Sequence, residues 1–159
     1  MKHVRNLLLT AQLGALLLIH TLPARAGVTV PFQGRFAGAE TGVANFPTLD
    51  VTGEVTGQAS HLGRFTMQYH VEVDLVTISS TGTAELIAAN GDRLFADVVG
   101  QATVVGPDLF SIEEHYTITE GTGRFQGASG SFVLARSLIE STGVTAGSFS
   151  GTLVLAKAK

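Results

Sequence analysis

The chain has 159 residues, 19 of them glycine, and contains neither cysteine nor tryptophan. This length is typical of one domain, and the lack of cysteine excludes disulfide bonds, thiolate metal sites and cysteine nucleophiles. The formal net charge of -3, with only 14% charged residues, argues against nucleic acid as a partner, because neutralising phosphates requires clustered lysine and arginine.

The first segment has the order of a secretory signal peptide. A basic start ending at Arg5 is followed by a mostly apolar stretch over residues 7–19 and by small residues at Ala24 and Ala26. The apolar stretch is shorter than the roughly 20 residues of a permanent transmembrane helix. We therefore expect cleavage after Ala26, a barrel domain over residues 27–159, and export to the periplasm or the medium. An uncleaved N-terminal anchor is the alternative.

The rest of the chain predicts strands from end to end. Residues of high β-propensity alternate with polar ones, and glycine-containing breaks recur, as in all-β sandwiches and barrels. Short connections such as Asn90-Gly91 favour tight hairpins and hence an antiparallel, up-and-down order. The eight predicted strands are Val30–Gly38, Leu49–Ala59, Gly63–Val76, Thr81–Ala89, Arg93–Val104, Leu109–Glu120, Ser129–Glu140 and Ala146–Ala156.

We predict that these strands close into an eight-stranded antiparallel β-barrel, because closure removes exposed sheet edges. In the third strand Met67 and Tyr69 share the apolar face, which must point inward in water. The opposite face carries acidic residues such as Glu72 and, in the sixth strand, Glu113. An outer-membrane barrel needs an apolar outer face, so we expect no membrane insertion after signal cleavage.

Two charged residues interrupt the apolar inner face. Glu114 precedes Tyr116 on the sixth strand, and Arg136 lies among leucines on the seventh. We expect these two to pair in register across adjacent strands, since an unpaired buried charge is costly. The pair is either a structural salt bridge at a barrel mouth or, with Tyr69 or Tyr116, the polar anchor of an apolar ligand cavity, for which Met67 is a further candidate ligand-binding residue. An arginine partner favours the charged carboxylate, which argues against a catalytic acid.

Glycine occupies several inward positions, where it weakens a strand and so requires a reason. One reason is curvature of the barrel wall, and the other is space left for a ligand. The inward glycines are Gly34, Gly53, Gly57, Gly100 and Gly151.

Two segments, residues 57–66 and 121–130, carry a resemblance to a known superfamily. The second reads Gly-Thr-Gly-Arg-Phe and resembles the Gly-Thr-Gly-x-Phe segment of dirigent proteins and the glycine-rich segment of allene oxide cyclases. Together the two segments resemble uncharacterised secreted bacterial proteins with the same barrel. The resemblance implies an eight-stranded barrel with a central cavity, often oligomeric. Plant members steer a reactive intermediate to one stereochemical outcome without a cofactor.

The catalytic residues of the plant enzymes match no position of this chain, so catalytic residues stay unknown. Only the glycine-rich loop corresponds, and its residues are interpreted as structural. Its glycines would supply positive φ, and its phenylalanine would plug one barrel end. These loop residues are Gly121, Gly123, Phe125 and Gly130.

A metal site is conceivable only by assembly across strands. His70 with Glu72, and Glu113 with His115, form two such pairs, but both lie on the polar outer side, so neither a metal nor another cofactor is expected.

Three functions remain open. The first is non-catalytic binding of a small hydrophobic molecule, or a structural role. The second is a cofactor-free cyclase or stereocontrolling protein, as the resemblance implies. The third is a protein-interaction module that works through its outer surface, as a homo-oligomer. A cavity with one convergent polar cluster favours the first two, whereas a filled interior leaves the third.

Overall fold

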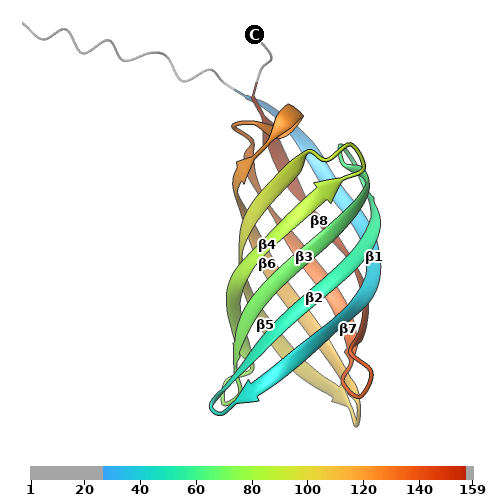
Figure 1. Cartoon of the computed structure of the whole chain (residues 1–159), viewed down its shortest axis with the longest axis vertical. Helices are drawn as coiled ribbons and strands as arrows, with labels where there is room; N and C mark the ends of the chain where they lie inside the picture. Colours follow the sequence, from blue (N-terminus) through green and yellow to red (C-terminus); the bar gives the residue numbers. More distant parts are fainter. Residues whose placement is uncertain (1–26, 157–159) are drawn as a thin grey trace, which may run out of the picture.

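The computed structural model describes residues 27–156 and shows a closed β-barrel (Figure 1). Each strand pairs antiparallel with its neighbour in the chain, and β8 pairs with β1, which confirms the predicted fold class. The strands are β1 (Val28–Asn45), β2 (Thr48–Ala59), β3 (Gly63–Asp74), β4 (Ser79–Ala88), β5 (Arg93–Gly106), β6 (Leu109–Gly121), β7 (Ser129–Ile139) and β8 (Val144–Leu155). The expected signal peptide lies outside the described residues. Within residues 27–156, no helix has the length and apolar character to span a membrane.

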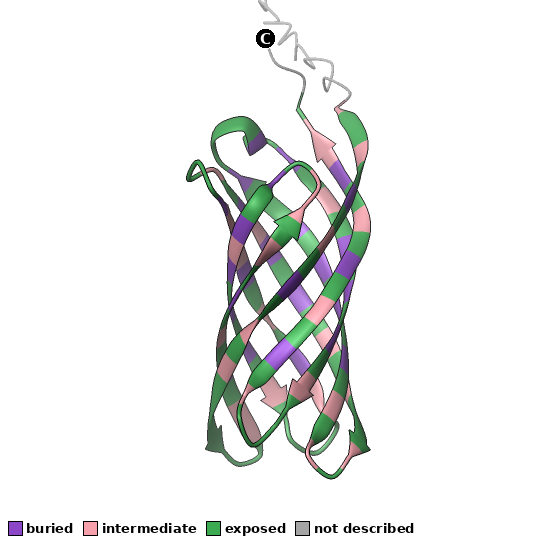
Figure 2. Cartoon of the chain, turned by 90° about the vertical axis from the view of Figure 1, so that its right-hand side faces the viewer, coloured by how far each residue is buried: buried purple, intermediate pink, exposed green. Residues whose placement is uncertain are grey.

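The inner and outer faces follow the alternation of the sequence, and Figure 2 shows buried and exposed stripes alternating along the strands. On β3, Phe65, Met67, Tyr69 and Val71 are buried, and Gln68 between them is exposed. Burial of one apolar face per strand is the main stabilising term of such a barrel.

The first strand is longer than predicted. β1 was expected to end at Gly38, yet it continues to Asn45 and pairs with β2 along this extension. Residues 38–45 read GAETGVAN, a run of low β-propensity. The ladder with β2 overrides that propensity, because the backbone groups need partners.

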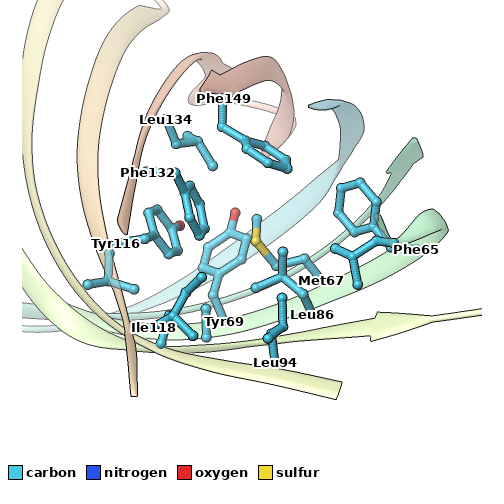
Figure 3. Packing of buried hydrophobic residues seen from close by; sticks show 14 of the residues in the cluster. Phe65, Met67, Tyr69, Leu86, Leu94, Tyr116, Ile118, Phe132, Leu134 and Phe149 are labelled. Carbon is cyan, nitrogen blue, oxygen red and sulfur yellow. The ribbon is translucent and has the colours of Figure 1, made fainter. Parts of the chain in front are cut away.

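One end of the barrel is closed. A short 3-10 helix η1 (Gly123–Phe125) follows β6, and the Phe125 side chain is 1% exposed at this end of the barrel. Behind it, aromatic side chains fill the interior (Figure 3), with the rings of Tyr116 and Phe132 stacked 4.6 Å apart. Gly123 and Gly130 have the predicted positive φ. Gly121 does not: a Cβ there would lie 2.3 Å from the carbonyl oxygen of Phe125, so close approach explains this glycine.

The opposite end, which we call the mouth, is formed by the four turns β1–β2, β3–β4, β5–β6 and β7–β8 (Figure 1). No helix caps it within the described residues.

Candidate functional site

A cavity of about 140 Å³ opens at the mouth. Its wall is apolar and includes Val51, Val71, Ala102 and Ile112. Its inner end, which we call the floor, is polar and consists of Glu40, Ser80, Glu114 and Arg136. An engineered cavity of similar size, about 150 Å³, accepts a benzene molecule, so one ring with a short substituent fits this space.

Arg136 is the centre of the floor. Its Nε and Nη2 donate to the two carboxylate oxygens of Glu114, each at 3.2 Å. Its Nη1 donates to Oε2 of Glu40 at 2.6 Å and to Oγ1 of Thr145 at 3.2 Å. The side chains of Arg136, Glu40 and Glu114 are 4%, 8% and 2% exposed. The guanidinium therefore holds both carboxylates out of water in a fixed geometry, as forked arginine–carboxylate pairing allows.

Two tyrosines hold the same carboxylates from the core side. The Tyr69 hydroxyl donates to Oε2 of Glu40 at 2.5 Å, and the Tyr116 hydroxyl donates to Oε2 of Glu114 at 3.1 Å. Arg136 also lies over the ring of Tyr69, 5.4 Å from its centroid. The carboxylates are thus fixed by hydroxyl donors as well as by charge.

The floor keeps its tyrosines neutral and its arginine charged. Burial raises the pKa of Tyr69, with Glu40 adding to the rise and Arg136 opposing it. Burial and Glu114 likewise raise the pKa of Tyr116. Burial alone would lower the pKa of Arg136, but the two carboxylates outweigh it and raise that pKa. The floor thus places one guanidinium beside two carboxyl groups.

Two inward glycines make this arrangement possible. Gly53 stands between Glu40 and Tyr69 in register across β1, β2 and β3, and a Cβ on Gly53 would lie 2.1 Å from the Tyr69 ring. The ring therefore crosses β2 at Gly53 to reach Glu40. Gly100 stands likewise between Ser80 and Glu114, whose atoms would meet its Cβ at 2.6 and 2.8 Å. At these positions neighbouring side chains fill the space, so the two glycines do not leave room for a ligand, as one of the two expected reasons required.

The structure confirms the predicted contact between Glu114 and Arg136 but corrects its register. Arg136 stands opposite Ile112 on β6, and Glu114 stands opposite Leu134, so the two side chains meet diagonally. Long side chains bridge such diagonal neighbours readily.

The other predicted site residues have different positions. Tyr69 and Tyr116 belong to the floor cluster through their hydroxyls. Met67 does not line the cavity and lies in the apolar core. Glu40 was missed, because the predicted first strand ended two residues before it. The even-numbered inward positions of that strand, continued past Gly38, would have placed Glu40 inside.

The two histidine pairs considered for a metal point outward. The side chains of His70 and His115 are 61% and 59% exposed, and each lies near one carboxylate, Asp50 and Glu113 respectively. Among residues 27–156, no three histidine or acidic side chains gather as metal ligands.

Comparison with known proteins identifies the fold. No protein-family model and no curated protein sequence matches the chain. Among solved structures, the pterocarpan synthase dirigent protein GePTS1 aligns with a TM-score of 0.64 at 12% identity, covering 92% of this chain and 100% of that one. The pterocarpan synthase dirigent protein PsPTS1 aligns with a TM-score of 0.61 at 12% identity, covering 84% of this chain and 99% of that one. The chain thus has a dirigent-like β-barrel fold, in agreement with the resemblance seen in the sequence.

Proposed function

We propose that the mouth cavity binds a small, mainly apolar molecule that carries one polar group. The observation that supports this function is the placement of the buried Arg136–Glu40–Glu114 cluster at the inner end of an apolar wall. Ligand pockets commonly combine apolar lining with a few convergent polar groups that fix orientation. The polar group of the ligand would lie on the floor, and its apolar body would contact the wall.

The size of the cavity restricts the ligand. Pockets for drug-sized molecules enclose about 300–1,000 Å³, whereas this cavity encloses about 140 Å³. A single-ring compound fits inside, and a longer molecule would extend through the mouth into solvent.

Binding can be followed through the protein's two tyrosines, which are the only ones in the chain and both contact the floor. We expect benzyl alcohol to shift the NMR signals of the two labelled rings in a saturable manner. The Ala102→Leu variant, which places a larger side chain in the cavity wall, should lose this binding.

Thr103→Leu is the matched control, because residue 103 lies next to Ala102 but is exposed on the outer face of β5. This variant should bind benzyl alcohol as the unmodified protein does. Equal binding by the Ala102→Leu variant would place the ligand elsewhere and overturn the proposed site.

A second candidate function is stereocontrol of a reaction, and the observation that favours it is the fold shared with two pterocarpan synthase dirigent proteins. A cavity with a fixed polar end and an apolar wall can hold a reactive molecule in one orientation. Chiral chromatography of a pterocarpan product formed with and without the protein tests this function. An unchanged enantiomer ratio would overturn stereocontrol and would leave ligand binding as the proposed function.

A further inference from the structure

We propose that the ligand of the mouth cavity is a cationic amphiphile, an apolar body that bears an ammonium group. This inference rests on the proposed binding function and adds the chemistry of the polar group. Four features of the described residues support it: the charge of the floor, the hydrogen-bonding groups that remain there, the distribution of charge around the mouth, and the apolar rim of the mouth.

The charge of the floor selects for a positive ligand. Glu40 and Glu114 share the single guanidinium of Arg136, and all three side chains are more than nine-tenths buried. A buried charge without a partner is strongly unfavourable. An ammonium group on the floor would bring its total charge to zero, whereas a carboxylate would add a second uncompensated negative charge.

The floor atoms that have no hydrogen-bond partner also favour a ligand whose polar group is a hydrogen-bond donor. Arg136 uses Nε, Nη1 and Nη2 on Glu114, Glu40 and Thr145, so its donors are largely occupied. Oε2 of Glu40 accepts from Tyr69 and Arg136, while its Oε1 has no hydrogen-bond partner among residues 27–156. Ser80 on the floor is 8% exposed, and its hydroxyl likewise has no hydrogen-bond partner among these residues. A carboxylate oxygen and a hydroxyl together suit an ammonium donor.

The charged residues around the mouth also favour a positively charged ligand. At or near its turns lie five acidic residues, Asp50, Glu72, Asp74, Asp108 and Glu140. Residues 27–156 contain no lysine, and four of their five arginines lie towards the closed end, at Arg35, Arg64, Arg93 and Arg124. The fifth is Arg136, inside the floor. In the described part of the chain the mouth thus carries acidic residues and no exposed arginine or lysine, a distribution that raises the local concentration of cations.

The rim of the mouth is also apolar. Most of the large apolar residues that are exposed within residues 27–156 lie there, at the ends of strands or in the turns. They are Val43, Phe46, Leu75, Val76, Val104, Val105, Leu109, Ile139 and Val144. An apolar rim with acidic neighbours complements a molecule that has an apolar body and a positive charge.

Three probes with one skeleton test the proposal: benzylamine, benzyl alcohol and benzoate, each titrated into the protein and followed by the two tyrosine signals. At neutral pH we expect benzylamine to bind about tenfold more tightly than benzyl alcohol, because hydrogen bonds to charged groups are stronger than neutral ones. Benzoate should bind more weakly than the alcohol.

Equal or tighter binding of the alcohol, or tightest binding of benzoate, would overturn the cationic ligand and leave the proposed binding function intact. Saturable binding of none of the three would instead overturn the binding function. Because this ranking uses the unmodified protein, the test remains decisive whatever the variants do.

Glu40→Gln locates the preference on the floor. The amide keeps an acceptor for Tyr69 and Arg136 but removes the excess negative charge, so the advantage of benzylamine over benzyl alcohol should disappear. Glu72→Gln is the matched control, since it removes the same charge from the exposed outer face of β3 near the mouth. It should keep most of that advantage. Loss of the advantage in Glu72→Gln but not in Glu40→Gln would overturn the role of the floor.

Discussion

At the scale of single residues, the floor is held together by shared donors. Oε2 of Glu40 accepts from both Tyr69 and Arg136, and Oε2 of Glu114 accepts from both Tyr116 and Arg136. Among residues 27–156, every side-chain nitrogen or oxygen that is fully shielded from solvent has a hydrogen-bond partner, whereas the two unpaired floor oxygens, Oε1 of Glu40 and the Ser80 hydroxyl, are not fully shielded. In a water-poor interior, such a satisfied network fixes one geometry, because every alternative leaves a polar atom unpaired.

The two tyrosines should make the protein sensitive to alkali. Because burial raises the pKa of Tyr69 and Tyr116 above the ordinary value near 10, their stabilising contribution is complete below that pH. It should be lost as the pH rises above about 10, since the unfolded chain then releases protons that the folded chain retains. We expect tyrosinate absorbance to stay low until the protein unfolds.

The measurement is an absorbance titration beside urea unfolding at neutral and alkaline pH. Protein already unfolded in urea is the control, and it should ionise near pH 10. Tyrosinate absorbance near that pH in the folded protein would contradict the prediction.

At the scale of strands, the site depends on residues of three neighbours standing in one row. Glu40 on β1, Gly53 on β2 and Tyr69 on β3 are register partners. A slip of one residue in either ladder would turn Glu40 or Tyr69 to the outer face, because side chains alternate strictly along a strand. The site therefore depends on the glycine at position 53 as much as on the side chains of Glu40 and Tyr69 on either side of it.

Gly53→Ala should displace Tyr69 from this row. Its Cβ would overlap the Tyr69 ring, so we expect a loss of about 1–3 kcal/mol in the free energy of unfolding, as in overpacked cores. Shifted Tyr69 ring signals should accompany the loss. Gly106→Ala is the matched control: its Cβ would lie 3.4 Å from Leu109, an ordinary contact, and its effect should be near zero. Equal stability of the two variants, measured by denaturant unfolding, would show that Tyr69 has room to adjust.

At the scale of the whole molecule, the barrel has no free edge within the described residues, because β8 pairs with both β7 and β1. Paired edges protect a sheet from adding strands of other molecules. The fold then depends on the joining of its first and last strands, and contacts so distant in sequence make folding slow relative to helical proteins.

Removal of β8 should prevent the chain from folding, rather than leave a folded seven-stranded sheet. A chain ending at residue 143 would expose the edges of β1 and β7 and would lose Phe149 and Leu153 from the core. We expect this chain to aggregate or remain unfolded, as judged by circular dichroism and size-exclusion chromatography. A chain ending at Ala156 removes only residues after β8 and is the control. A soluble, β-rich chain ending at residue 143 would contradict the prediction.

Much of this architecture could be predicted from the sequence. Alternation along β3 and β6 indicated the inner faces, and Glu114 and Arg136 were visible as charges within them. Glu40 could not be found by propensity, since it lies in a run of glycine, alanine and threonine that becomes a strand only through pairing. The roles of Gly53 and Gly100 depend on cross-strand register, which no single strand encodes. The signal peptide and export stay predictions.

The packed core behind the floor closes the mouth cavity at its inner end, so the cavity has a single opening. The proposed ligand would therefore enter with its polar end first and leave through the same opening. One end of that ligand would be buried, and the other end would face solvent in a single orientation. A second reactant could then approach the bound ligand only from the side that faces solvent.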